Sequence, residues 1–168
     1  MLDLLIPTIA QGLLWSLLAL GVYITFRVLD IADLSVEGTF PLGAAVAATC
    51  ITSGHSLVTA FVLAVLAGCV AGAVTGLLTT KLKIPALLSG ILTMIGLYSI
   101  NLRVMGRANL SLLGQTTIYS WGASAGLTEA QTTLAVGLIA ALLVVAVVYW
   151  FFGTEIGLAL RATGYNPQ

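Results

Sequence analysis

Three acidic or hydroxyl side chains stand together just after the first long apolar run, in the segment Asp33–Gly38. In one interpretation, Asp33 and Glu37 cap the start of a helix at a cytoplasmic turn, because carboxylates accept hydrogen bonds from the free N–H groups there. In the other, Asp33, Ser35 and Glu37 belong to a discontinuous helix that lines a pathway, where water or protein satisfies the irregular backbone. The second interpretation predicts that the start of this helix contacts or gates a polar solute.

A second polar group lies on the apolar run Ile84–Leu102. Ser89, Thr93 and Gly96 share one helical face by their three- and four-residue spacing, and Asn101 follows near the end of the run. The hydroxyl groups either bond back to carbonyls of their own helix or form one wall of a polar conduit. The conduit interpretation gives a candidate substrate pathway of six residues: Asp33, Ser35, Glu37, Ser89, Thr93 and Asn101.

Small residues form a third pattern. Gly68, Gly72 and Gly76 recur every four residues and form a smooth stripe along one helix. In lipid, such a stripe lets two helix backbones approach closely, because packing rather than hydrophobicity drives helix association there. The stripe therefore predicts a tight helix–helix contact and says nothing about a substrate.

Enzyme chemistry has little support in the sequence. Cys50, Cys69 and His55 are too few for a zinc or iron–sulfur site, and both cysteines lie inside apolar runs. The pattern G-x-x-x-x-G-K-[ST] of phosphate-binding loops does not occur, so we expect no ATP site on this chain. We therefore predict no catalytic residues, no metal and no cofactor. A membrane-embedded enzyme would need a nucleophile–base or metal cluster.

The composition places these residues in a bilayer. Of the 168 residues, 60% are apolar and 7% are charged, whereas roughly 25% are charged in a typical soluble domain. Six basic and six acidic residues cannot cover the surface of a soluble domain of this size. This excludes a cytosolic globular enzyme, a disordered tail and a disulfide-rich secreted module. The net charge is zero and no basic run occurs, which argues against nucleic-acid binding.

Four uncharged runs are long enough to cross a membrane, since about 20 apolar residues span roughly 30 Å of hydrocarbon. They are Leu4–Phe26, Val58–Thr80, Ile84–Leu102 and Thr132–Thr154. The first run resembles a signal peptide in length, but Asp3 replaces the usual basic segment and no small-residue cleavage site precedes Arg27. We therefore expect a retained helix.

A further crossing is shorter. The uncharged stretch Gly38–Ser53 has Pro41 near its start, and proline suits the first turn of a helix. A helix from Pro41 to Ser53 would measure about 20 Å, too little to span a bilayer. We therefore expect an all-α polytopic membrane protein with about five transmembrane crossings. The second crossing is broken into a polar stretch and a half-helix, and residues 1–168 form a single transmembrane domain.

The basic residues of the short loops predict the orientation. The turn at Lys81 and Lys83 is assigned to the cytoplasm, and alternation of the crossings then fixes the other loops. The N-terminus is external, and residues 103–131 form a long external loop. Four basic residues lie inside and two outside: Lys81, Lys83, Arg27 and Arg161 inside, Arg103 and Arg107 outside. After the last span, residues 157–164 form either a short amphipathic cytoplasmic helix that ends at Gly164 or a plain linker.

Three stretches resemble the inner-membrane permeases of bacterial ABC importers, in the group of branched-chain amino acid and ribose permeases. The first is similar to the segment that opens the family's second transmembrane helix. The second is similar to a subgroup often linked to aromatic amino acids, and the third to the loop that couples the permease to its ATPase. In order, they are Phe26–Gly43, Leu88–Gly106 and Gly157–Gly164.

The chain departs from this family in two ways. Tyr165 stands where an acidic residue is common. Family members are also considerably longer, whereas this sequence stops at Asn166-Pro167-Gln168, inside the coupling region. We therefore expect it to be the N-terminal part of such a permease.

The resemblance implies alternating access in the bacterial inner membrane, with no bond chemistry in the permease itself. It implies three protein partners: a periplasmic or lipoprotein solute-binding protein, a cytoplasmic ABC ATPase subunit that binds the ATP, and a second permease copy. The substrate would be a small nutrient, an amino acid in the first place. The coupling contact falls on four residues: Gly157, Arg161, Ala162 and Gly164.

The alternative function is a secondary carrier or channel for a small polar solute, which would work without ATP. The middle of each of the four long runs contains no acid and no lysine. This argues against a proton-coupled carrier, which usually needs a titratable group in the membrane.

Overall fold

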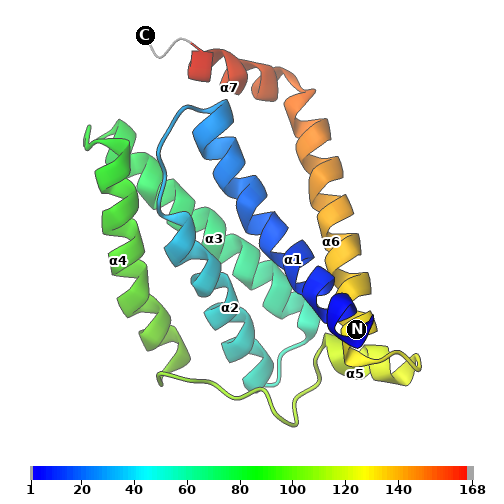
Figure 1. The fold of residues 1–168 in the computed structure, drawn as a ribbon. Coiled ribbons are helices and arrows are strands. Elements are labelled where there is room, and N and C mark those ends of the chain that lie inside the picture. Colours follow the sequence, from blue (N-terminus) through cyan, green and yellow to red (C-terminus); the bar gives the residue numbers. More distant parts are fainter. Residues whose placement is uncertain (1, 166–168) are drawn as a thin grey trace. The chain divides into compact units, whose positions relative to one another are not determined.

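The computed structural model describes residues 2–165, and every regular element in that range is a helix (Figure 1). In chain order the elements are α1 (Leu2–Tyr23), the π-helical turn η1 (Ile24–Val28), α2 (Val36–Thr52), α3 (Leu57–Thr80), α4 (Ala86–Met105), α5 (Ile118–Ser124), α6 (Glu129–Phe152) and α7 (Glu155–Tyr165).

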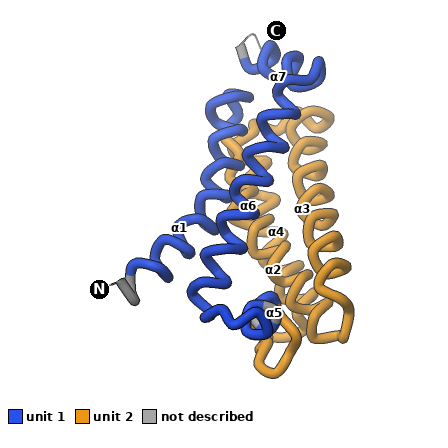
Figure 2. Tube along the Cα trace, turned by 90° about the vertical axis from the view of Figure 1, so that its right-hand side faces the viewer, with its two compact units in different colours: residues 1–31, 118–168 blue, residues 32–117 orange. Residues whose placement is uncertain are grey.

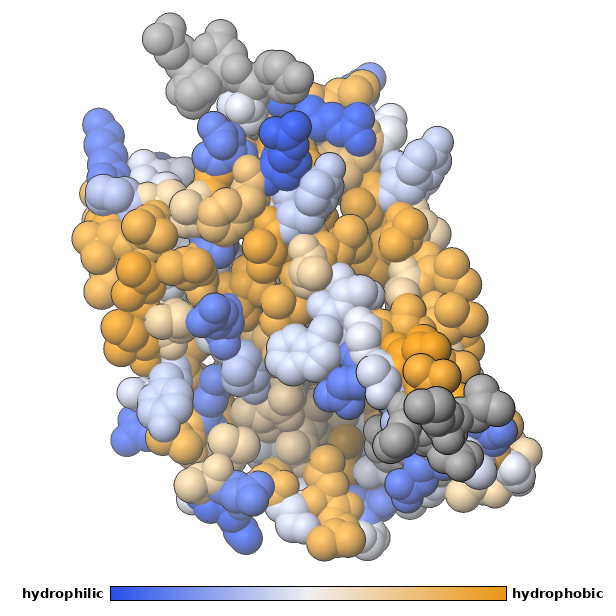
Figure 3. Space-filling view, viewed as in Figure 1, coloured by the Kyte–Doolittle hydropathy of each residue, from blue (hydrophilic) through white to orange (hydrophobic). Residues whose placement is uncertain are grey.

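Four of these helical segments are long and apolar enough to cross a membrane: Leu5–Val28, α3, α4 and α6. The apolar helix α2 is shorter, with 17 residues. Hydrophobic side chains cover much of the visible surface (Figure 3). Phe61 on α3 is 69% exposed and Ile139 on α6 is 63% exposed, which suits contact with lipid rather than water. The predicted all-α polytopic fold is confirmed.

Helix α2 begins earlier than the sequence predicted. Its first residue is Val36, so Pro41 lies inside the helix and not in its first turn. The N–H groups of Gly38 and Thr39 already donate to the carbonyl of Ser35, at 3.0 and 2.9 Å, so helical bonding starts before the proline. At 1.5 Å per residue, α2 is about 26 Å long. The predicted start of the half-helix was therefore wrong, while residues 29–35 before it are non-helical.

Two other boundaries also differ from the prediction. The region 103–131 contains the short helix α5, and α4 continues to Met105, where Gly106 takes a left-handed φ of 68°. Helix α7 runs through Gly164 to Tyr165, so Gly164 does not end it. The reason for a glycine there is close packing, described below.

The helices form two compact units (Figure 2). One unit, here called the central unit, comprises residues 32–117 and contains α2, α3 and α4. The other, here called the terminal unit, comprises residues 1–31 and 118–168 and contains the remaining helices. Each unit contains helices of spanning length.

In the central unit, α2 packs against both α3 and α4. The buried apolar cluster consists of Leu42, Ala71 and Leu97, one residue from each helix, with Val46 and Ala67 packed against it. The side chain of Thr49 on α2 also donates to the carbonyl of Val104 on α4, at 3.3 Å. The three helices therefore share one small interior.

In the terminal unit, α1 and α6 lie side by side and run in the same direction (Figure 1). They approach closely at Gly137, where a Cβ would lie 3.3 Å from Cβ of Leu13 and 3.6 Å from the carbonyl oxygen of Ala10. Helix α7 follows α6 and contacts η1 at the end of α1. Arg27 and Arg161, predicted to share one side of the membrane, therefore lie at the same end of this unit.

Candidate functional site

The non-helical segment before α2 lies directly on α4. A Cβ added to Gly90 would lie 2.7 Å from the backbone nitrogen of Leu34 and 3.2 Å from that of Ser35. No side chain fits in that space, so glycine is the residue that lets the segment and the helix touch. No pattern of spacing in the sequence marks Gly90 for this contact, although it stands beside Ser89.

A second close approach lies one to two turns further along α4. A Cβ on Gly38 of α2 would lie 2.9 Å from Cα of Met94 and 3.2 Å from Cβ of Leu97. Gly38 and Gly90 together hold the start of α2 against α4. These two glycines, and not a regular stripe, make the tight contact that the structure describes in the central unit.

Asp33 shapes the entry to α2. Its carboxylate oxygen accepts a hydrogen bond from the N–H of Ser35 at 2.8 Å, which closes an Asx turn over residues 33–35. Ser35 is 2% exposed and occupies the position before the first residue of α2, without a capping bond from its side chain. Glu37, in the first turn of the helix, is exposed. This bond orders the chain just before α2, but it reaches the N–H of Ser35 and not those of the first helical turn, so it does not decide between the two interpretations of this segment.

Three predicted pathway residues lie on the buried face of α4. The Ser89 hydroxyl donates to the carbonyl of Ile84 at 3.3 Å, back along its own chain. Thr93 accepts a hydrogen bond from the hydroxyl of Thr75 on α3 at 3.0 Å. The amide nitrogen of Asn101 donates to the carbonyl of Gly38 at 3.5 Å, and its oxygen is buried without a partner among the described residues. The structure therefore places Ser35, Ser89, Thr93 and Asn101 inside the central unit.

The predicted face of α4 is partly wrong. Gly96 is exposed and would meet no atom within 4 Å, whereas Leu97 is 6% exposed and belongs to the core. The buried face follows the four-residue series Ser89, Thr93, Leu97 and Asn101. Its residues face both α2 and α3, because α4 packs against both helices.

The glycine stripe on α3 lies elsewhere. A Cβ on Gly68, Gly72 or Gly76 would meet no atom within 4 Å. Within the described central unit, no other helix packs onto this stripe. The tight contact predicted from it therefore remains a prediction, and its partner would lie outside the central unit.

Three of the four predicted coupling residues lie on the face of α7 that meets the terminal unit, and the fourth, Ala162, lies on the neighbouring face. Gly157 and Gly164 face the terminal unit: a Cβ on Gly157 would overlap the carbonyl oxygen of Phe151, and one on Gly164 would overlap that of Val28. The guanidinium carbon of Arg161 lies 5.0 Å from the centre of the Phe152 ring, on the same side. Leu158 and Ala162 are exposed on a neighbouring face, here called the outer face, and Arg161 is exposed as well.

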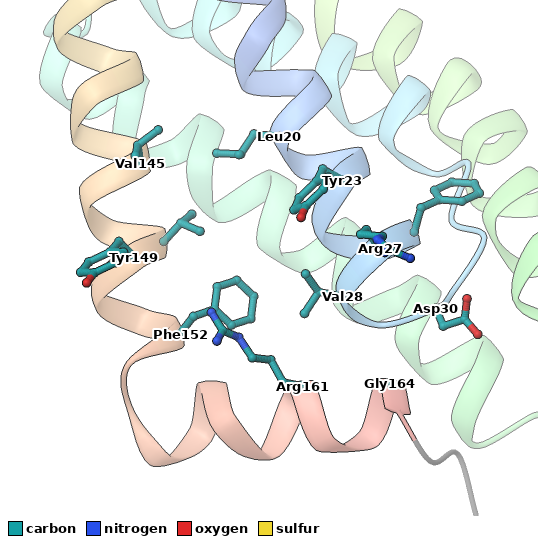
Figure 4. A pocket seen from close by; sticks show the side chains of 12 residues that line it. Leu20, Tyr23, Arg27, Val28, Asp30, Val145, Tyr149, Phe152, Arg161 and Gly164 are labelled. Carbon is teal, nitrogen blue, oxygen red and sulfur yellow. The ribbon is translucent and has the colours of Figure 1, made fainter.

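A cavity of about 750 Å³ lies beneath α7 in the terminal unit (Figure 4). Its walls come from α1, η1, α6 and α7, and they carry Arg27, Asp30 and Arg161. These three residues are far apart in the sequence, and no motif groups them as one site. The signal was available, because the predicted orientation placed Arg27 and Arg161 on the same side of the membrane.

The described residues contain no group of three or more His, Cys, Asp or Glu side chains arranged to hold a metal ion. The chemistry that the central unit offers is hydrogen bonding from hydroxyl, amide and carboxylate groups within an apolar helical frame.

Comparison with protein families decides the class. The family model described as the permease component of branched-chain amino acid transport systems matches residues 4–168. The chain belongs to this permease family. The family predicted from three short stretches is thereby confirmed.

The chain is similar in sequence to two curated proteins. A tyrosine transport system permease protein of Clostridioides difficile (strain R20291) is 39% identical over 164 residues, which cover 98% of this chain and 53% of the relative. An uncharacterised protein of Rickettsia prowazekii (strain Madrid E) is 35% identical over 167 residues, covering 99% and 57%. The chain thus spans about half the length of the curated relatives it matches. No solved structure matches it significantly.

Proposed function

We propose that this chain forms part of the permease of an ABC importer that moves an amino acid, in the first place an aromatic one, across the bacterial inner membrane. The observation that carries the proposal is the family match over residues 4–168. The relative that is 39% identical is named a tyrosine transport system permease, which favours an aromatic substrate. The permease has its N-terminus outside and works by alternating access, while a separate ATPase subunit binds the ATP.

The solute path follows the contact between residues 33–38 and α4. This is where the backbone is non-helical beside a membrane helix, and such backbone is tolerated where protein or a water-filled path satisfies it. The buried polar groups of Ser35, Thr93 and Asn101 lie along the same contact. A small shift of the segment on Gly90 would expose them, which gives alternating access a local structural basis.

The ATPase docks on the outer face of α7. That face carries Leu158, which is 55% exposed, beside Ala162. Apolar side chains on an exposed cytoplasmic helix suit a groove of a partner protein. The inward face, with Gly157 and Gly164, anchors α7 to the rest of the terminal unit. A solute-binding protein on the external side and a second permease copy complete the assembly.

Uptake of labelled tyrosine separates this function from its alternative. The permease is co-expressed with two proteins. One is the ATPase subunit that co-purifies with the permease, and the other is the solute-binding protein. We expect uptake that disappears when the phosphate-binding lysine of that ATPase is substituted. Uptake that survives this substitution would identify a secondary carrier or a channel, and loss of uptake without the binding protein would support the importer further.

A further inference from the structure

The cavity of the terminal unit changes in polarity from one end to the other. It is about 750 Å³ in volume and lies near the ends of α1 and α6, beside α7. Leu20 and Val145 line it from the two spanning helices, whereas Arg27, Asp30 and Arg161 line it near α7. Figure 4 shows both groups around the same space. A ligand that fills the cavity must therefore be apolar at one end and charged at the other.

The charged end attracts an anion. Two guanidinium groups and one carboxylate line it, so positive charge is in excess. The guanidinium of Arg161 stacks over Phe152 at 5.0 Å, and Phe152 is only 7% exposed, so a fixed ring orients the cation. A planar, oriented guanidinium presents two parallel N–H donors, the geometry that binds phosphate oxygens.

The apolar end belongs to the bilayer. Leu20 lies in the spanning segment Leu5–Val28, and Val145 lies in the spanning helix α6. Tyr23 and Tyr149 stand between the apolar and the charged ends and are 57% and 84% exposed. Exposed tyrosines on spanning helices mark the level of the lipid headgroups. The cavity thus crosses from the acyl-chain region to the headgroup region.

We propose that this cavity binds one anionic phospholipid, with its phosphate between Arg27 and Arg161 and an acyl chain along Leu20 and Val145. A zwitterionic headgroup would bring a cation of its own to a site that already has an excess of positive charge. Free phosphate would leave the apolar end empty. Basic pockets between membrane helices bind anionic lipid headgroups on these physical grounds. The inference does not depend on which solute the protein transports.

Native mass spectrometry of the purified protein tests the proposal. Phosphatidylglycerol and phosphatidylcholine are offered in equal amounts, and the lipid retained on the protein is measured. We expect phosphatidylglycerol to be retained preferentially, and Arg27→Gln/Arg161→Gln to lose it by about tenfold or more. The matched control is Lys81→Gln/Lys83→Gln, which removes two exposed charges from the other unit and should change retention little.

A second pair of variants tests the apolar end and covers the case in which the arginine variant fails to fold. Val145 and Val147 are both 53% exposed on α6, but only Val145 lines the cavity. We expect Val145→Trp to reduce retention of phosphatidylglycerol and Val147→Trp to leave it unchanged. Inorganic phosphate in large excess should not displace the lipid.

Three results would overturn the proposal. Equal retention by the wild type and both cavity variants would show that another part of the protein, or no lipid, occupies the space. Equal retention of the two lipids would remove the role of charge. Displacement by inorganic phosphate, with Val145→Trp behaving as the wild type, would mean that the arginines bind a free anion and not a lipid.

Discussion

The backbone of Leu34 touches α4 at Gly90, where its nitrogen stands 2.7 Å from the position that a Cβ would occupy. This contact fixes the path of the chain into α2, because atoms of Asp33 and Ser35 also lie close to the position of a Cβ on Gly90. The segment proposed as the solute gate therefore rests on a surface with no room for one methyl group.

The first prediction follows from this contact. Gly90→Ala should lower the free energy of unfolding by about 1–3 kcal/mol, because the added methyl group would force the backbone of Leu34 to move within a packed interior. It should also reduce uptake, since the gate is displaced. Gly96→Ala on the same helix is the control, because nothing lies within 4 Å of its added methyl. Denaturant titration in detergent measures stability, and equal stability of the two variants would contradict the close contact.

The second prediction concerns the hydroxyl pair Thr75–Thr93, which joins α3 to α4 at 3.0 Å. Thr75 also donates to the carbonyl of Ala71 on its own helix at 3.2 Å, so part of its bonding survives without Thr93. A double-mutant cycle with Thr75→Val and Thr93→Val should therefore give a coupling of only about 0.6 kcal/mol, typical of hydrogen bonds between membrane helices. Unfolding in a graded detergent mixture gives the four stabilities.

Cycles that pair Thr80→Val with Thr93→Val should give no coupling, because Thr80 bonds to Gly76 of its own helix. A coupling between Thr75 and Thr93 that is no larger than this control would mean that the two hydroxyls do not act as a pair. They would then stabilise their own helices separately.

The sequence was enough to predict where the long helices lie along the chain. It was not enough to predict which face of each helix packs against another helix. Spanning runs are found from composition, because each covers about 30 Å of hydrocarbon by itself. Which face of a helix is buried depends on the neighbours. The even spacing of Gly68, Gly72 and Gly76 indicated a contact that the other helices of the described central unit do not make, whereas the isolated Gly38 and Gly90 contact α4 and the chain before α2. A glycine needed for one close approach leaves no periodic signal.

The same limit applies to the polar residues. Ser89, Thr93 and Asn101 were found because polar side chains stand out in an apolar run. Their bonding partners, such as Thr75 and the carbonyl of Gly38, come from other helices and could not be found from spacing. Pro41 was misleading because the chain begins α2 one turn before it, starting from the carbonyl of Ser35.

The third prediction distinguishes a gate from a plain helix cap. Single cysteines at Ser35 and Glu37 are introduced after Cys50 and Cys69 are replaced by serine. A membrane-impermeant thiol reagent should label Glu37→Cys at all times, because that residue is exposed. Ser35→Cys should be protected at rest, since Ser35 is 2% exposed, and should be labelled during ATP turnover. Protection of Ser35→Cys in both states would mean that Asp33 and Ser35 only fix the turn that leads into α2.

The last prediction compares the two faces of α7. Leu158 is 55% exposed on the outer face, whereas the guanidinium of Arg161, three residues further on, lies over the Phe152 ring. If the ATPase docks on the outer face, Leu158→Glu places an unpaired charge in an apolar contact and should lower recovery of the ATPase by about tenfold or more. Arg161→Gln should leave that recovery nearly unchanged. Affinity purification from the same membranes measures both, with uptake measured in parallel. The reverse pattern, with loss of the ATPase only in Arg161→Gln, would mean that the guanidinium leaves the ring and makes the coupling contact itself, as the sequence alone had predicted.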